Sequence, residues 1–316
     1  MPTISVIIPC FNVAPFIEEC IESVISQSFK EIEMICIDDC STDQTYEILR
    51  SYESRGLCQL ARHDVHTGPG AARNTGLALA KGDYLFFLDS DDVLAPNIFH
   101  TLYQMALETD ADVISSQVQH FDELGKKAIS YSLKGIQRPY KFANHKSALL
   151  GRVYVAAWGR LYKRSFFLEK IGLFSVGVWC EDVMPFLRGQ IFASKLAISQ
   201  EVGVLWRQRI GSISKSKVNT ADIGLYLMQA YELFKTTFPL SYREDFLIFA
   251  GNTYGWYEKS DELQAFYLAT ISELGYTDID IVRSVNIKRL RKMQGRKVSL
   301  IDRVRCRVNV FQKSFA

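Results

Sequence analysis

The sequence predicts an α/β fold, in which helices cover both faces of a mostly parallel sheet and a helical C-terminal region follows. Apolar runs of strand length alternate with helical patterns over the first 121 residues, which is typical of doubly wound sheets. From Ala221 to about Glu273 the pattern is wholly helical and rich in Tyr, Phe and Leu. A chain of 316 residues with 48% hydrophobic content can bury a large core. We predict two domains, 1–215 and 216–316.

The elements follow from local patterns. The first strand is an apolar run that ends at Pro9, because proline cannot donate to a central ladder. Ser41 and Gln44 have the spacing of a capping box, which predicts the start of the second helix at Ser41. The predicted strands span 4–9, 33–39, 58–62, 84–88, 111–121, 158–162 and 195–206. The other predicted helices span 15–27, 68–80, 96–108 and 182–193, and residues 122–142 are expected to form a loop.

Composition narrows the function classes. The 37 basic and 35 acidic residues nearly balance, so the overall charge argues neither for nor against nucleic acid, and no nucleic-acid partner is expected. The first residues run straight into a strand pattern, so no secretory signal is expected. No run of about eighteen or more apolar residues is present, so no membrane span is expected. The seven cysteines form no CxxC pair and suit free thiols, which predicts a cytoplasmic protein.

The strand at 84–88 ends abruptly in Asp89, Asp91 and Asp92. Ligands bind at the carboxyl ends of strands in open α/β sheets, and carboxylates packed there repel unless a cation lies between them. Asp89 and Asp91 suit Mg²⁺ or Mn²⁺ together with a diphosphate, because these cations prefer oxygen ligands. The alternative is an acidic turn that faces solvent.

Four fragments occur in order: SVIIPCFN, IDDCSTDQT, GPGAARNTGLALAKGDYLFFLDSDD and WCEDVMPF. In this order and spacing they resemble the family 2 glycosyltransferases of the GT-A fold, over roughly residues 3–215. The resemblance is greatest to bacterial enzymes that build capsular, exopolysaccharide or O-antigen sugars. It implies an inverting, metal-dependent transfer of a sugar, of the hexosyltransferase type, from a nucleoside-diphosphate donor to a saccharide or lipid-linked saccharide. The implied nucleotide is UDP, with thymidine and guanosine forms open.

The resemblance implies where the donor binds. Pro9 and Phe11 lie against the uracil ring, and Asp39 accepts its N–H. Arg73 contacts the nucleotide or its phosphates. The implied metal residues are those of the DXD motif: Asp91 binds the metal, and Asp89 supports it or meets the ribose. The alternatives are an ordinary turn at Pro9 and Phe11, helix capping around Asp39, and a surface position for Arg73.

The resemblance also implies the catalytic base and a loop. The base is Asp182, with Glu181 as its neighbouring alternative, although such a pair can also simply cap a helix. Residues 206–214 look like the family's mobile loop, in which Arg207 and Arg209 close over the diphosphate or form a basic surface. The QxxRW motif of processive synthases is absent, which favours a single-transfer enzyme.

The C-terminal region carries its own charge pattern. Between Arg283 and Lys313 there are eleven basic residues and one acid, a local net charge of +10. Apolar residues recur at spacings of three and four from Val298, so residues 298–316 predict a basic amphipathic helix. Such a helix suits the cytoplasmic face of an anionic membrane; a packing or homodimer helix is the alternative.

Three other functions are weighed against transfer. A sugar nucleotidyltransferase has a similar fold and metal site, but it needs a glycine-rich basic loop after the first strand, where this chain has PCFN. A phosphoacceptor signalling domain, with Asp38 and Asp39 around Asp89, leaves Asp91 and the residues after 121 unexplained. A binding-only relic is the third, although no essential group is missing from the sequence.

Overall fold

The computed structural model describes residues 2–122, 127–131, 156–178, 180–208, 220–237, 246, 249–250 and 261–276. Arg209, the remainder of the predicted mobile loop and the basic tail lie outside this range. The chain divides into two compact units, Met1–Arg243 and Glu244–Ala316. The predicted boundary at residue 215 falls outside the described residues and stays a prediction.

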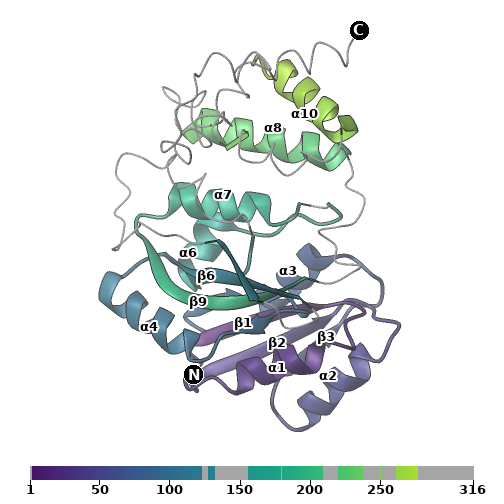
Figure 1. Cartoon of the computed structure of the whole chain (residues 1–316), viewed down its shortest axis with the longest axis vertical. Helices are drawn as coiled ribbons and strands as arrows, with labels where there is room; N and C mark the ends of the chain where they lie inside the picture. Colours follow the sequence, from purple (N-terminus) through teal and green to yellow (C-terminus); the bar gives the residue numbers. More distant parts are fainter. Residues whose placement is uncertain are drawn as a thin grey trace. The chain divides into compact units, whose positions relative to one another are not determined.

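One half of the sheet is parallel, in the order β3-β2-β1-β4 (Figure 1). Its strands are β1 (Ile4–Cys10), β2 (Ile32–Asp38), β3 (Gln59–Arg62) and β4 (Tyr84–Phe87). All residues of β1 are buried, as expected for a central strand covered on both faces. Pro9 does not end this strand, because Cys10 still pairs with Asp38. Pairing of β1 with β4 stops at Ile7, so no hydrogen bond to β4 is required at Pro9, which has no N–H to donate.

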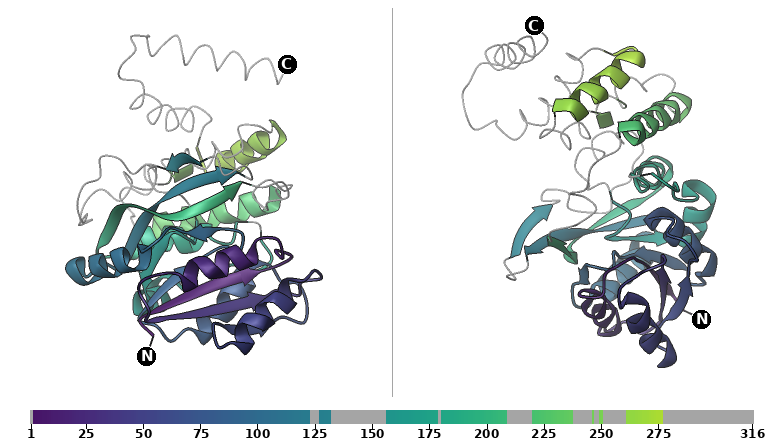
Figure 2. Two further views of the ribbon diagram at one scale, coloured as in Figure 1. Left: turned by 60° about the horizontal axis from the view of Figure 1, so that its bottom comes forward. Right: turned by 90° about the vertical axis from the view of Figure 1, so that its right-hand side faces the viewer.

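The other half of the sheet is mixed. Its strands are β5 (Val93–Leu94), β6 (Val113–Asp122), β7 (Lys127–Tyr131), β8 (Arg160–Lys163) and β9 (Leu196–Gln208). β8 joins β4 antiparallel, β6 joins β8 antiparallel, and the long strands β6 and β9 run parallel side by side (Figure 2). The prediction of a loop over 122–142 was wrong at β7, which forms a strand paired with β6. The strand was missed because a short strand among polar residues has little apolar alternation. The predicted α/β class, with helices on both faces, is confirmed.

Helices cover the two faces of the sheet (Figure 1). They are α1 (Ile17–Ile25), α2 (Thr45–Ser54), α3 (Pro69–Leu79), α4 (Ile98–Thr109), α6 (Arg164–Phe166), the π-helix η1 (Phe167–Ile171) and α7 (Val183–Phe192). Apolar residues of α1, α2 and α4 share one core with Ile4, Val6 and Ile8 of β1. On the opposite face α3 packs tightly, because a Cβ on Gly76 would lie 2.4 Å from the side chain of Ile7. α3 therefore packs directly on the parallel half of the sheet, against β1 and β2.

The C-terminal helices agree with the predicted helical region. In the first unit, α8 (Thr220–Thr237) packs against α7. In the second unit, α10 (Asp261–Glu273) carries the buried Tyr267, whose hydroxyl donates to the carbonyl of Ala250 at 2.6 Å. No helix among the described residues has both the length and the apolar character to cross a membrane.

Candidate active site

The parallel strands bring polar groups to one edge of the sheet. β1, β2 and β3 end level with one another, because Cys10 pairs with Asp38 and Asp38 pairs with Arg62. The residues that follow the strands, which include Phe11, Asp39, His63 and Asp89, therefore start at the carboxyl edge where such sheets bind ligands.

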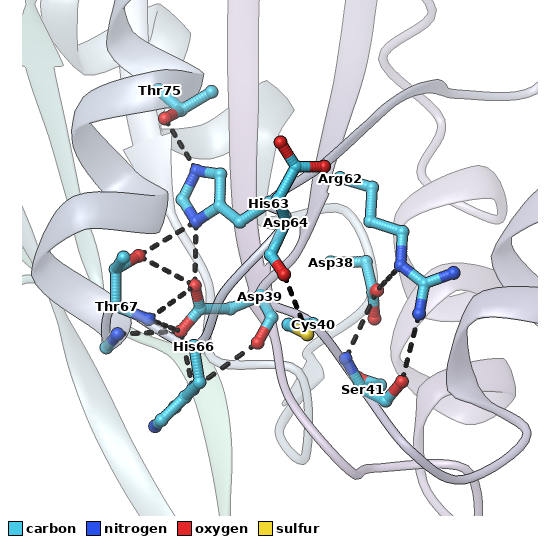
Figure 3. Close-up of polar contacts among 11 residues, drawn as sticks. Asp38, Asp39, Cys40, Ser41, Arg62, His63, Asp64, His66, Thr67 and Thr75 are labelled. Carbon is cyan, nitrogen blue, oxygen red and sulfur yellow. Dashed lines mark hydrogen bonds and ion pairs between the residues drawn. The ribbon is translucent and has the colours of Figure 1, made fainter.

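Asp39 is the centre of a hydrogen-bond network at this edge (Figure 3). Its carboxylate accepts hydrogen bonds from the backbone N–H groups of Thr67 and Gly68, and from the Thr67 hydroxyl, at 2.7–3.1 Å. His63 and His66 also approach it through Nδ1, at 2.7 and 2.8 Å. Burial alone would raise the pKa of Asp39, but the hydrogen bonds from His63, Thr67 and Gly68 outweigh it and lower the pKa. Asp39 is thus ionised and holds the loop that leads into α3.

Phe11 carries a ring at the same edge. It is 36% exposed, and it stacks on the imidazole of His66 with ring centroids 3.8 Å apart and planes 24° apart. Phe11 and Asp39 are both predicted to contact the base, and the side chain of His66 contacts both of them. Pro9 lies two residues earlier in β1.

Asp38, the first acid of the pair, is structural. It is fully buried, and its carboxylate pairs with Nε of Arg62 at 3.1 Å and accepts the N–H of Ser41 at 3.3 Å (Figure 3). The predicted capping box was wrong, because α2 begins at Thr45 with no side-chain cap from its N-cap residue. Asp43 accepts the N–H of Thr45 at 2.9 Å instead.

Arg73 joins two parts of the site that are far apart in the sequence. One guanidinium nitrogen donates to Asp89 at 2.7 Å, and another donates to Glu181 at 2.6 Å. The residue is only 3% exposed. Burial disfavours its charge, but Asp89, Glu181 and Asp182 outweigh burial and raise its pKa. A cation in the first turns of a helix needs an anionic partner, and the partners here are carboxylates of the protein itself.

The DXD turn is fastened to β9. The N–H of Asp92 donates to the carbonyl of Asp89 at 3.0 Å, which closes the turn. Asp92 is fully buried and accepts the backbone N–H of Arg207 at 2.9 Å, while burial and the charges of Asp91 and Asp89 raise its pKa well above the usual range. Asp91 is partly exposed beside them. The turn therefore leaves Asp91 partly exposed, whereas Asp92 is buried and bonded to the backbone of β9.

Arg207 lies in a strand, so the prediction of a loop from residue 206 was wrong at its start. β9 continues to Gln208, because it pairs with β6 as far as Asp122. The Arg207 side chain donates to the carbonyl of Asp91 at 2.9 Å and pairs with Glu19. It also lies 4.5 Å from the ring centroid of Phe121. The guanidinium is thus held directly beside the DXD turn.

The predicted acidic pair opens α7, with Asp182 as its N-cap residue. Glu181 is 8% exposed and committed to the ion pair with Arg73. Burial, then the charge of Glu181 and more weakly that of Asp89, raise the pKa of Asp182 to about 7, although Arg73 opposes the shift. No ion pair of Asp182 is found among the described residues. Asp182 therefore has the pKa expected of a general base that works near neutral pH.

α3 holds this acidic segment in place. The side-chain amide of Asn74 donates to the carbonyl of Phe174 at 3.0 Å and accepts its N–H at 2.8 Å. A Cβ on Gly70 would lie 2.1 Å from the carbonyl oxygen of Ser175, so only glycine permits the approach. Asn74 and Gly70 thus position the segment that carries Glu181.

The geometry agrees with comparisons to known proteins. Residues 5–169 match the model of the family described as glycosyl transferase family 2. The chain belongs to this family. It is 30% identical over 230 residues to the glycosyltransferase GlyG of Streptococcus pneumoniae serotype 4, a match that covers 68% of this chain and 73% of GlyG.

Further relatives share parts of the chain or its fold. A Campylobacter jejuni protein named as GalNAc(5)-diNAcBac-PP-undecaprenol beta-1,3-glucosyltransferase is 29% identical over 172 residues, which is 54% of each chain. The crystal structure of residues 1–349 of S. aureus TarS in complex with UDP-GlcNAc is similar with a TM-score of 0.71 at 20% identity, over 90% of this chain and 82% of that chain. The likeness to TarS supports the predicted GT-A fold of the glycosyltransferase.

Sequence reasoning missed several residues of this candidate site. His63, His66 and Thr67 organise Asp39, and Asn74 anchors Phe174, yet none was singled out. A histidine or an asparagine in a loop carries no periodic signal. Trp158 is only 5% exposed and packs in the core, which does not suit a stacking platform for an acceptor sugar.

The raised pKa of Asp182 predicts a pH-dependent stability. An unfolded Asp has a pKa of about 3.9, so ionisation costs the folded glycosyltransferase stability as the pH rises from about 4 to about 7, and the cost is then constant. Asp182→Asn cannot ionise. We expect this variant to melt at a higher temperature than the unchanged chain at pH 8, with a difference that shrinks toward pH 5, in thermal unfolding at a series of pH values. Asp110→Asn is the control, because partners on the surface lower the pKa of Asp110; a pH-independent difference for Asp182→Asn would refute the shift.

Proposed function

We propose that the chain is an inverting glycosyltransferase that moves a sugar from a UDP-sugar to a saccharide or lipid-linked saccharide in surface polysaccharide synthesis. The single observation that carries this proposal is the buried ion pair from Asp89 through Arg73 to Glu181. It joins the DXD turn, suited to the donor diphosphate, to the segment that carries a carboxylate with the pKa of a base. Donor and acceptor chemistry are thereby brought side by side.

The donor site is proposed at the carboxyl edge. Phe11, with Pro9 behind it, faces the nucleobase, and Asp39 either accepts a base N–H or holds the loop that lines the pocket. Arg207 lies close enough to the DXD turn to offset charge on the diphosphate, and Arg209 remains a prediction for the same role. Arg73 acts by positioning Asp89 and Glu181, since both of its terminal nitrogens are already engaged.

In the proposed transfer step Asp182 acts as the base. The hydroxyl oxygen of the acceptor attacks the anomeric carbon on the face opposite the diphosphate, and the bond from that carbon to the diphosphate oxygen breaks. Asp182 takes the hydroxyl proton as the new bond forms, which is general-base catalysis. Glu181, which is neutralised by Arg73, keeps the segment in register. Attack from the opposite face inverts the anomeric configuration.

The carboxylates of the DXD turn can supply only some of the ligands that a divalent cation needs. No cluster of three or more His, Cys, Asp or Glu side chains suited to a metal occurs in the described part of the chain. Asp91 is partly exposed, while one oxygen of Asp89 is held by Arg73. Mg²⁺ commonly binds through one or two carboxylates and substrate phosphates, so Asp91, with support from Asp89, is suited to hold Mg²⁺ or Mn²⁺ once a diphosphate is present. The cation would stabilise charge on the leaving diphosphate.

Asp91→Ala tests the metal site. We expect transfer to fall to background and the Mn²⁺-dependent part of UDP affinity to disappear, because the partly exposed carboxylate of the turn is lost. Calorimetric titration of UDP with and without Mn²⁺ measures this affinity. Asp43→Ala, which changes an acid at the start of α2, is the control. Full activity of Asp91→Ala, or of the unchanged protein in excess chelator, would rule out the metal.

The cellular setting is also proposed. The six cysteines of the described residues are free thiols, which suits the reducing cytoplasm. The undecaprenol-linked substrate in the name of the Campylobacter relative supports a lipid-linked acceptor, which would bring the enzyme to the cytoplasmic face of the membrane. A homodimer through the C-terminal region is the alternative use of that region.

Removal of residues 298–316 separates these uses. We expect the truncated chain to bind anionic liposomes more weakly than the full chain, because the segment adds positive charge near the headgroups. Sedimentation with phosphatidylserine vesicles measures binding, and rising salt should weaken it for the full chain. Equal binding of both chains, with a change of oligomeric state after truncation, would favour the dimer.

A further inference from the structure

His66 occupies a chemically specific position at the carboxyl edge. Its ring stacks face to face on Phe11, and its Nδ1 lies 2.8 Å from Asp39. Nδ1 of His66 also lies 3.3 Å from the backbone carbonyl oxygen of Asp39. A flat ring with a nitrogen beside a carboxylate is what a uracil would offer to the same two side chains, through its face and its ring N–H. One protein side chain therefore makes both contacts expected of the donor base.

His66 is also placed to leave without disturbing its surroundings. Its side chain is 50% exposed, whereas that of His63 is 17% exposed and bridges Asp39 to the hydroxyl of Thr75. If His66 moves away, Asp39 keeps its hydrogen bonds from Thr67 and Gly68 and its contact with His63 (Figure 3). The loop remains anchored while the face of Phe11 and the position of the His66 nitrogen beside the Asp39 carboxylate become available.

We infer that His66 is a placeholder for the nucleobase, and that the donor must displace the His66 ring from Phe11 and Asp39 in order to bind. The inference rests on the proposed function, since it takes a nucleoside diphosphate as the ligand. His66 then sets base specificity, because a base must offer both a stacking face and a ring N–H to replace the contacts of the imidazole with Phe11 and Asp39. Binding is weakened by the free energy of the contacts that are lost.

Calorimetric titration of UDP into the full chain and into His66→Ala tests the inference. Removal of the competing ring should tighten UDP binding about tenfold, the scale of one aromatic stack and one hydrogen bond together. The affinity for inorganic pyrophosphate, which has no base, should be the same in both proteins. His100→Ala, at an exposed position on α4, is the control and should leave both affinities unchanged.

Two further arms make the outcome decisive. His66→Gln keeps a hydrogen-bond donor without a ring and should bind UDP with intermediate affinity. In the unchanged chain, the His66 ring protons are shielded by Phe11, so their NMR signals, assigned by comparison with His66→Gln, should move downfield when UDP binds. Unchanged or weaker UDP binding by His66→Ala, or equal tightening for UDP and pyrophosphate, would overturn the inference. If the unchanged chain binds no nucleoside diphosphate at all, the proposed function itself fails.

Discussion

Asp182→Asn is expected to lower kcat by about 10²–10⁴, the usual loss when a general base is removed. Asparagine keeps the shape of the side chain but cannot take the proton of the acceptor hydroxyl. UDP affinity should stay within about twofold of the unchanged protein, because the proposed donor contacts come from other residues. Steady-state turnover and calorimetric UDP binding, measured on the same preparations, separate the two effects.

Glu181→Gln is the matched variant for the neighbouring acid. It removes a negative charge beside Asp182, which lowers the raised pKa of Asp182 toward its usual value, and it weakens the ion pair with Arg73. We expect a smaller loss of kcat and a loss of stability. Normal turnover in Asp182→Asn with an inactive Glu181→Gln would reverse the assignment, and normal turnover in both variants would place the base elsewhere.

Arg73→Met is expected to lower the free energy of unfolding by about 3–5 kcal/mol, the usual cost of removing one partner from a buried ion pair. Asp89 and Glu181 would be left facing each other without the cation that both of them bind. Methionine approximates the volume of the aliphatic part of arginine, so the loss should report charge rather than a cavity. The midpoint and slope of urea unfolding measure it, with turnover expected to fall as well.

Lys163→Met is the control for a surface ion pair. Lys163 binds Asp110 at 2.9 Å, with side chains 39% and 68% exposed, so its loss should cost less than about 1 kcal/mol. Similar effects of the two substitutions would mean that Arg73 is solvated in solution and does not link the DXD turn to the acidic segment.

The sequence predicted the elements whose pattern is local. β1 and β4 are apolar runs, and α3 begins with Pro69 after Gly68, which has a φ of 89° and ends the loop. These patterns depend on neighbours along the chain, and they also place Asp39 and Asp89 at strand ends. The family resemblance then placed Asp182 at the start of a helix, where the structure has it.

The rest depends on contacts between segments that are distant in the sequence. Arg73 and Glu181 are 108 residues apart, and no pattern in either segment specifies the other as its partner. The antiparallel insertion of β8 between β4 and β6 is set by packing rather than by periodicity. Arg207 was expected in a loop because residues 206–214 resemble the family's mobile loop. Its backbone bond to Asp92 and its pairing with β6 keep it in β9.

The proposed use of Asp182 as the base for inverting transfer from a nucleotide sugar can be tested directly. The most direct test is to incubate the full chain with Mn²⁺, a panel of UDP-, dTDP- and GDP-sugars, and soluble and undecaprenol-linked saccharides. Released nucleotide and the anomeric configuration of the product are measured. We predict release of UDP that depends on an acceptor, one nucleotide for each sugar transferred with inverted configuration, and its loss in Asp182→Asn. A retained configuration, or undiminished transfer by Asp182→Asn, would contradict the account.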